Sequence, residues 1–187
     1  MILVDFSQVM ISNIMMNLAN NDSKLDEDMV RHMVLSSIRL YKKKFGAEYG
    51  EIVICADGPN CWRKDIFPHY KAGRRKAREK STHDWSTIFN ALHMIRDEIA
   101  DNMPYPVLRF EGAEADDIIA VLCKWSQSNQ LIENGLVSEP QKMLIISSDH
   151  DFIQLQKYDN VTQWSPNTKK FVKATTKEIH EKTITHI

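Results

Sequence analysis

The sequence predicts an α/β protein in which helices cover both faces of a mostly parallel sheet. Short apolar runs typical of buried strands alternate with longer segments whose apolar residues recur at helical spacing. These runs are continuous, unlike the alternating pattern of a half-exposed antiparallel strand. With 187 residues, 43% of them hydrophobic and 26% charged, the chain can bury one sizeable core, so we expect a single domain over residues 1–187.

The first half of the chain predicts two strands and a helix. Residues 1–6 form an apolar run that reaches an aspartate, which indicates a strand. Residues 25–45 indicate a helix, with acids at its start and lysines at its end as the helix dipole favours. Its apolar stripe consists of Met29, Val30, Met33, Val34, Ile38 and Tyr41. Residues 51–58 form a second apolar run that ends in Asp-Gly-Pro, which predicts a strand followed by a turn.

The second half continues the alternation. A helix is expected over 81–102, behind a Ser-Thr start, with an apolar stripe of Trp85, Ile88, Phe89, Leu92, Ile95 and Ile99. A strand at 105–110, a helix at 114–129 and a strand at 142–149 follow. Residues 161–175 predict a hairpin that turns at Ser-Pro-Asn.

Composition excludes a membrane protein and favours a reducing compartment. Nothing approaches the roughly 18 consecutive apolar residues of a membrane span, and the N-terminus lacks the basic leader of a secretory signal. Cys55, Cys61 and Cys123 form no Cys-x-x-Cys pair, and an odd number suits reduced thiols. We therefore expect a cytoplasmic protein whose cysteines are small core residues.

The net charge of −1 conceals a basic block. Between Arg63 and Lys80 lie eight basic residues, at 63, 64, 71, 74, 75, 76, 78 and 80, against only Asp65 and Glu79. Such a block is either a binding surface for a polyanion or a solvated arm. Its position directly after the acid-ended second strand favours contact with a nucleic acid.

Acidic residues stand at every predicted strand exit. In a parallel α/β sheet the functional site lies beyond the carboxyl ends of the strands. Carboxylates 4 Å apart repel by roughly 4 kcal/mol at an effective dielectric constant near 20, so such a group needs cations or protons. Oxygen ligands alone suit Mg²⁺ or Mn²⁺, and a two-ion site supports phosphodiester hydrolysis. The acids are Asp5, Asp57, Glu114, Asp116, Asp117, Asp149 and Asp151.

Each acid also has a purely structural interpretation. Asp57 begins a good turn, and the Glu-Ala-Asp-Asp stretch places negative charge at a helix N-terminus. Singly, these interpretations are at least as good as a functional one. Together they do not explain why all the strand exits are acidic. His150 lies between two candidate ligands, but a loop histidine is usually solvated, and we assign it no role.

With these residues assembled, the chain resembles the 5′-nuclease (flap endonuclease) family, most closely its ribonuclease H branch from T-even-type phages. The resemblance spans nearly all of the chain. It is carried by LVDFSQ (3–8), DIFPHYKAGRRKAREKSTHDW (65–85), EADDIIAVL (114–122), LIISSDHDFIQLQKY (144–158) and VTQWSP (161–166). The combination is specific, although no single stretch is.

The resemblance implies a PIN-like sheet with a basic helical arch, here residues 60–83, over the active site. It implies Mg²⁺-dependent cleavage of DNA flaps and removal of RNA primers during phage DNA replication, in the host cytoplasm. By position, Asp5, Asp57, Asp116 and Asp149 match the first metal site and Asp151 the second. Glu114 and Asp117 fit as water-mediated or supporting members. The implied partners are 5′-flapped or single-stranded DNA, RNA–DNA hybrids, a single-strand-binding protein and a sliding clamp.

The basic block receives roles from the same resemblance. Lys71 and Arg74 match the pair that reaches the scissile phosphate. At i and i+3 of a helix both would lie on one face, close to one phosphate. Tyr70 and Trp62 either stack on bases or pack beside the core, and packing is the better expectation. The remaining cations would form a salt-sensitive funnel along single-stranded DNA; with Tyr70, Lys71 and Arg74, the DNA-binding candidates are Arg75, Lys76, Arg78 and Lys80.

The sequence departs from the family at its C-terminal end. The Gly-Asp-x-x-Asp stretch, which completes the second metal site and opens a helix-hairpin-helix motif, is missing, and no glycine follows Gly135. We therefore expect a fragment, a short gene or a split gene whose second chain supplies the rest. The first metal site looks complete and the second has one direct ligand, so this chain alone should have weak or conditional activity.

Two other classes compete with a nuclease. A binding module of the same fold would grip single-stranded 5′ ends without cutting them. A phosphatase or signalling domain would need Asp-x-Asp at the first strand, where this chain has one acid, and no G-x-x-x-x-G-K-[ST] loop is present.

Overall fold

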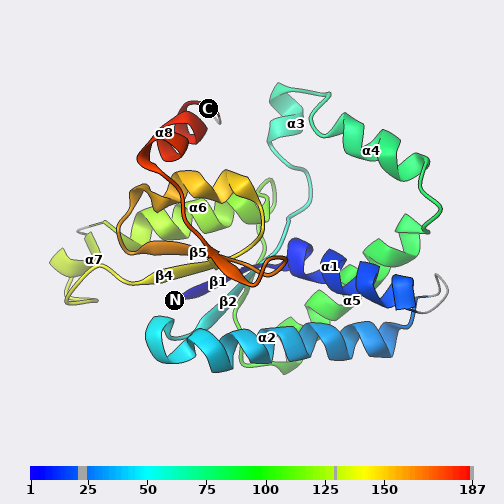
Figure 1. Ribbon diagram of the computed structural model, residues 1–187, viewed down its shortest axis with the longest axis horizontal. Helices are drawn as coiled ribbons and strands as arrows, with labels where there is room; N and C mark the ends of the chain where they lie inside the picture. The colour runs from blue at the N-terminus through cyan, green and yellow to red at the C-terminus, as the bar shows by residue number, and fades with distance from the viewer. Residues whose placement is uncertain (21–24, 129, 186–187) are drawn as a thin grey trace.

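The computed structural model describes residues 1–20, 25–128 and 130–185. Its centre is a six-stranded sheet in the order β3-β2-β1-β4-β5-β6 (Figure 1). All neighbours pair in parallel except β5 and β6, which are antiparallel. The predicted fold class is therefore confirmed, including the hairpin near Ser-Pro-Asn. The strands are β1 (Ile2–Asp5), β2 (Ile52–Cys55), β3 (Val107–Leu108), β4 (Met143–Ile146), β5 (Val161–Ser165) and β6 (Lys170–Val172).

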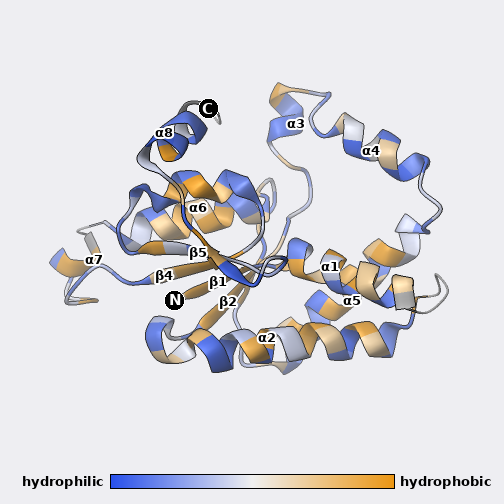
Figure 2. Ribbon diagram, viewed as in Figure 1, coloured by the Kyte–Doolittle hydropathy of each residue, from blue (hydrophilic) through white to orange (hydrophobic). Residues whose placement is uncertain are grey.

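One face of the sheet is covered by α1 (Phe6–Asn20), α2 (Glu27–Tyr49) and α5 (Trp85–Asn102). Alternate residues of a strand point to opposite faces. Ile2 and Val4 of β1 therefore enter this layer, together with Ile52 of β2 and Trp164 of β5. Figure 2 shows apolar residues along the strands and on these helices.

The other face is covered by α6 (Ala115–Ser126) and the 3₁₀-helix η1 (His150–Lys157). Leu3, Val53 and Ile145 point into this second layer, where they join Ile119 of α6 and Phe152 of η1. A final helix, α8 (Thr176–Thr185), packs against η1, and the short α7 (Gln130–Glu133) precedes β4. With both faces covered, the sheet strands are almost fully buried, which explains their continuous apolar sequences.

Between β2 and α5 the chain leaves the sheet and forms an arch, here residues 60–83, with α3 (Arg63–Ile66) and α4 (Ala72–Glu79). It rises from the sheet and returns to the start of α5 (Figure 1). Helix α4 is strongly hydrophilic (Figure 2). Two residues of the arch, Asn60 and Lys71, have a φ of 55°, a left-handed conformation that non-glycine residues seldom adopt.

Several local predictions are corrected. The helix α1, the 3₁₀-helix η1 and the helix α8 had no predicted counterpart. Met29 is 47% exposed, so it lies outside the buried stripe of α2, which continues to Tyr49 and ends before Gly50 (φ 85°). The predicted strand 105–110 shrinks to two residues at the sheet edge. Helix α5 begins at Trp85, because Asp84 caps it by accepting from the amides of Ser86 and Thr87.

Within the described ranges, no helix combines the length and the apolar character that a bilayer crossing demands. Cys55, Cys61 and Cys123 are buried as free thiols, so the expectation that the cysteines are small core residues is confirmed.

Candidate metal centre and basic cleft

Four aspartates meet at the carboxyl edge of the sheet. Asp5 is the last residue of β1, and Asp57 follows β2. Asp149 follows β4, and Asp116 lies in the first turn of α6. Because β2, β1 and β4 are parallel neighbours, their ends share one edge, as the sequence predicted.

Hydroxyl and amide donors hold two of these carboxylates in place. The Ser147 hydroxyl donates to Asp5 Oδ2 at 3.1 Å. The Ser7 hydroxyl donates to Asp57 Oδ2 at 2.8 Å, and the Ala115 amide donates to Asp57 Oδ1 at 2.8 Å. The start of α6 is therefore tied directly to the end of β2, so the side chain orientations depend on contacts between distant segments.

The aspartates influence one another electrostatically. Burial raises the pKa of Asp5 to about 7, and the nearby charges of Asp116 and Asp57 contribute to this increase. Burial also raises the pKa of Asp116 to about 6; Lys71 opposes this change, whereas Asp149 and Asp57 reinforce it. Carboxyl groups in this condition gain from a nearby cation, which favours their charged forms.

The acidic side chains of the site are widely spaced. In the described part of the chain, no three histidine, cysteine or acidic side chains stand close enough together to hold a metal ion by themselves. The complete first metal site expected from the sequence therefore stays a prediction. The donor set still fits Mg²⁺ or Mn²⁺, because these hard ions accept a few carboxylates together with water and substrate phosphate oxygens.

Glu114 and Asp117 have partners of their own. They form a reciprocal capping box at the start of α6. Asp117 also accepts two 2.8 Å hydrogen bonds from Arg63, while Glu114 accepts from Lys71 at 2.7 Å and from the Tyr70 hydroxyl at 2.8 Å. Burial opposes the charge on Glu114, but the bonds from Lys71 and Tyr70 outweigh it and lower the pKa of this carboxyl. Both acids thus tie α6 to the arch.

Asp151, the candidate ligand of a second ion, is paired with a lysine. Its Oδ1 lies 2.9 Å from Lys182 Nζ on α8. Its backbone amide donates to Asp149 Oδ1 at 3.0 Å, so the two acids of the Asp-His-Asp stretch are linked. His150 is exposed, in keeping with the absence of an assigned role.

A cleft of about 1060 Å³ separates the arch from α1, α5 and the acidic edge. Asp57 and Glu114 lie at its acidic end. Its basic side chains come from the arch, from α5 and from the segment after β3: Lys64, Lys71, Arg74, Arg78, Arg96 and Arg109. Of the four aspartates at the sheet edge, Asp57 lines this cleft, which is therefore suited to an extended anion that passes beside it.

Lys71 and Arg74 both line this cleft, but not as two residues of one helix. Lys71 is the residue before α4 and has a left-handed backbone conformation (φ 55°), while Arg74 is exposed within α4. The prediction that both residues lie in one helix, at i and i+3, is therefore wrong, because α4 begins at Ala72, one residue after Lys71. The Lys71 side chain instead turns back to Glu114. A left-handed non-glycine residue costs roughly 1–2 kcal/mol, and such strain is typical of functional sites.

The other basic residues of the arch that were predicted to bind DNA differ in position, and their role stays a prediction. Arg78 lines the cleft, with its guanidinium 5.1 Å from the centre of the Phe89 ring. Lys76 and Lys80 are exposed and lie outside the cleft lining. The backbone places Arg75 on α4, and its side chain lies outside what the structure describes.

Trp62 and Tyr70 are neither simple core residues nor free stacking platforms. Trp62 is 45% exposed and donates its indole N–H to Asp117 at 3.3 Å. The Arg63 guanidinium lies 4.7 Å from the centre of its ring. Tyr70 supports Glu114 through its hydroxyl. The preferred expectation of packing beside the core is wrong for these two aromatics, which join the polar network at the foot of the arch.

Sequence reasoning missed the residues that orient the acids. Asp57 accepts a hydrogen bond from Ser7, and Asp5 accepts one from Ser147. Asp117 accepts from Arg63. The serines had a local signal, because each lies two residues from a strand-end aspartate in Asp-Phe-Ser or Ser-Ser-Asp. Arg63 had none, since its partner is 54 positions away.

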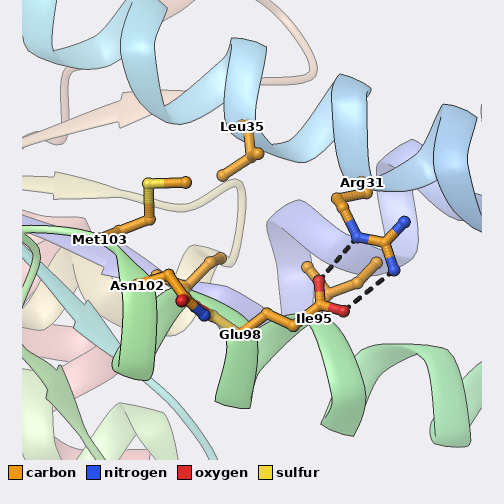
Figure 3. A pocket seen from close by; sticks show the side chains of 7 residues that line it. Arg31, Leu35, Ile95, Glu98, Asn102 and Met103 are labelled. Carbon is orange, nitrogen blue, oxygen red and sulfur yellow. Dashed lines mark hydrogen bonds and ion pairs between the residues drawn. The ribbon is translucent and has the colours of Figure 1, made fainter.

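A smaller pocket of about 280 Å³ lies between α2 and α5, on a different part of the molecule. Figure 3 shows Arg31 and Glu98 joined across it, with Nε–Oε2 and Nη2–Oε1 distances of 2.7 and 3.0 Å. The remaining lining is largely apolar and includes Leu35 and Met103. None of the candidate site residues lines this pocket. Its ion pair links α2 to α5.

The fold and these side chains define a class of α/β domain with an acidic sheet edge facing a basic, arched cleft, an arrangement suited to phosphodiesters. Residues 1–184 match the profile of the family described as 5′-3′ exonuclease, N-terminal resolvase-like domain. The chain belongs to this family. The resemblance stated from the sequence is thereby confirmed.

Two curated relatives are similar in sequence. Ribonuclease H of Enterobacteria phage T4 is 44% identical over 174 residues, which are 91% of this chain and 53% of the relative. Flap endonuclease Xni of Shewanella piezotolerans is 32% identical over 104 residues, covering 55% of this chain and 32% of the relative. The chain thus spans about half the length of the phage relative. Its match to the bacterial relative covers about a third of that protein.

Solved structures from bacteriophage T5 share the fold. The D15 protein co-crystallised with metal ions and its complex with DNA and metal ions each have a TM-score of 0.65 and 19% identity, covering 91% of this chain and 55–56% of theirs. The zinc-bound T5 5′-exonuclease also has a TM-score of 0.65, with 21% identity, and covers 92% of this chain and 57% of that one.

Proposed function

We propose that the chain is the catalytic domain of a divalent-metal-dependent 5′ nuclease that cuts DNA flaps and removes RNA primers in phage replication. The observation that carries the proposal is the convergence of Asp5, Asp57, Asp116 and Asp149 at one sheet edge beside a basic cleft. Membership of the 5′-3′ exonuclease family supports it, as do the metal ions and DNA bound to structural relatives. Mg²⁺ is the proposed ion, with Mn²⁺ as a substitute.

In this proposal the residues have distinct tasks. The four aspartates hold the first ion and Asp151 contributes to the second, while Ser7 and Ser147 fix carboxylate orientations. When bound, such ions would supply an activated water and stabilisation of the leaving oxygen. Lys71 and Arg74 contact the scissile phosphate and offset the charge that develops on it. Glu114 and Asp117 act indirectly, because they anchor Lys71 and Arg63 at the foot of the arch.

The domain organisation is part of the proposal. Residues 1–187 form one catalytic domain in which the arch of residues 60–83 guides a single strand towards the acids. Because the chain covers only about half of the phage relative, duplex contacts and further ligands of the second ion are assigned to a C-terminal part, which a second chain would supply if the gene is split. The domain would act in the host cytoplasm, alongside a single-strand-binding protein and a sliding clamp.

Cleavage of a 5′-flapped duplex labelled at its 5′ end tests this function. The protein, alone and with any product of an adjacent gene, is incubated with Mg²⁺ or Mn²⁺. Asp149→Asn should reduce the cleavage rate at least 100-fold, because it removes a ligand charge but keeps the Oδ1 acceptor for the Asp151 amide. Asp159→Asn, at an exposed turn, is the control and should cut normally.

A binding module without cleavage is the second candidate, favoured by the Lys182–Asp151 pair and by the open geometry of the aspartates. It predicts flap affinity that depends on Lys71 and Arg74, with no product in either metal. Inert wild-type protein on flap, gap and primer substrates would eliminate the nuclease in favour of this module. Cleavage that disappears in Asp149→Asn would eliminate the module.

A further inference from the structure

The cleft contains a second basic group opposite the arch, here called the floor cluster: His93 and Arg96 on α5, and Arg109 just after β3. All three line the cleft, and none belongs to the basic block of residues 63–80. In Figure 1 α5 runs below the arch, so this group and α4 face the cleft from different elements. Neither the family match nor the sequence patterns assign it a role.

Arg96 is the fixed member of the floor cluster. Its side chain is only 7% exposed, yet it is charged and needs partners. Nε and Nη2 donate to the Asp97 carboxylate at 2.8 and 2.9 Å, and Nη1 lies 2.9 Å from His93 Nδ1. A guanidinium has only donors, so His93 Nδ1 accepts and the proton of this neutral ring is on Nε2. Burial, Arg96 and Arg109 all lower the pKa of His93, in agreement with a neutral ring.

Arg109 is exposed, as is His93, and it carries the net positive charge of the floor cluster. Asp97 offsets Arg96, whereas Arg109 is directed to the acidic edge, where its Nε donates to the Asp57 backbone oxygen at 3.3 Å. Its guanidinium therefore stands beside the proposed metal ligands while lining the cleft. An arginine in such a position presents a planar set of donors that matches phosphate oxygens.

We propose that the floor cluster is a phosphate-binding site for a DNA strand in the cleft, at a phosphate different from the one that Lys71 and Arg74 contact. This inference rests on the proposed function and assigns the cleft two phosphate contacts, made by residues of different elements. Arg109 supplies the positive charge that attracts the phosphate. Arg96 presents a rigid guanidinium to it, and His93 donates a hydrogen bond from Nε2. Contacts at two separate phosphates would help to fix the register of the strand relative to the acids.

Equilibrium binding of a 5′-flapped oligonucleotide tests the floor cluster. Fluorescence anisotropy is measured in EDTA, without cleavage, at several salt concentrations. Arg109→Gln should weaken binding about 3- to 10-fold and reduce the slope of log K against log salt by about 0.7, the value for one single-strand phosphate. Arg39→Gln, an exposed arginine of α2 outside the cleft, is the matched control and should leave both unchanged.

Two further variants separate this inference from the proposed function. Lys71→Ala should also weaken binding, and the double variant Lys71→Ala, Arg109→Gln should show additive free energies, because the residues contact different phosphates. If Arg109→Gln behaves like the Arg39 control while Lys71→Ala loses affinity, the floor-cluster site is refuted and the proposed function stands. If neither variant loses affinity, the cleft is not the DNA path and both ideas fail.

Discussion

At the scale of single residues, Gly58 shows how tightly the acidic edge is built. A Cβ at this position would lie 1.7 Å from the carbonyl oxygen of Phe110 and 3.0 Å from that of Ala113. The Gly58 amide also donates to the Ala113 carbonyl at 2.8 Å. The loop that carries Asp57 therefore approaches the segment before α6 too closely for any side chain.

We expect Gly58→Ala to lower the free energy of unfolding by about 1–3 kcal/mol, the usual cost of overpacking. Gly73→Ala in α4 is the matched control, because its Cβ would meet open space, and alanine in a helix stabilises by roughly 0.5–1 kcal/mol. Urea unfolding followed by tryptophan fluorescence measures both. Equal effects of the two variants would show that the close approach at Gly58 is not real.

Asp5 is a carboxyl whose charge is disfavoured in the folded protein, because it is buried. Because its pKa is raised from 3.8 to about 7 in the folded protein, folding favours the neutral carboxyl. Its contribution to stability is present below about pH 4 and is lost as the pH rises towards 7, since the unfolded state then gains more from ionisation.

We therefore expect the free energy of unfolding in EDTA to fall between pH 4 and pH 7, and Asp5→Asn to flatten this fall by something on the order of 1–3 kcal/mol. Urea titrations at a series of pH values measure the slope. Asp101→Asn, at an exposed position of α5, should leave it unchanged. If the free energy of unfolding of Asp5→Asn fell with pH as steeply as that of the wild type, burial of the Asp5 carboxylate would not be the cause of the fall.

At the scale of elements, α8 contacts the acidic edge through an ion pair between Lys182 and Asp151. Lys182 Nζ stands 2.9 Å from Asp151 Oδ1, so an ammonium group already compensates the carboxylate assigned to the second ion. Another lysine of the same helix, Lys177, pairs with Glu181 at 3.8 Å and is 84% exposed.

Lys182→Met should increase the number of Mn²⁺ ions bound, or tighten the weaker one at least threefold, because Asp151 loses a competing cation. Calorimetric titration gives the stoichiometry and affinity, and Lys177→Met provides the control from the same helix. If Lys182→Met binds Mn²⁺ like the wild type, Lys182 does not compete at this carboxylate.

Most elements were predictable because their signals are local. The strands are buried on both faces, so their apolar runs are continuous, and α2, α5 and α6 carry apolar stripes. The helix α1 was missed because it has no acidic first turn and no basic last turn, and its apolar residues follow the first strand directly. The helix α8 did carry a signal, the Thr-x-x-Glu box of Thr175 and Glu178, which typically marks a helix start.

The candidate site was predictable in its acids but not in their partners. A parallel sheet forces strand ends to one edge, so the meeting of Asp5, Asp57 and Asp149 follows from topology alone. The pairing of Asp151 with Lys182 and the backbone conformation of Lys71 depend on how separate elements pack. Single-sequence patterns contain no information about such contacts.

At the scale of the whole molecule, the sheet, the arch and α5 together make a cleft that is basic along its length and acidic at one end. The sheet supplies rigid positions for the carboxylates. The arch is joined to α6 through the Lys71–Glu114 and Arg63–Asp117 pairs, which are partly buried. These pairs therefore connect the arch to the helix that carries Asp116.

We propose that the aspartates at this edge hold divalent ions, and electron paramagnetic resonance of Mn²⁺ tests this binding most directly. Adding the wild-type protein should diminish the signal of free Mn²⁺ in proportion to bound ion. Asp116→Asn and Asp149→Asn should weaken binding at least tenfold, while Asp159→Asn should not. Wild-type protein that leaves the Mn²⁺ signal unchanged, or binding that survives both substitutions, would contradict the claim.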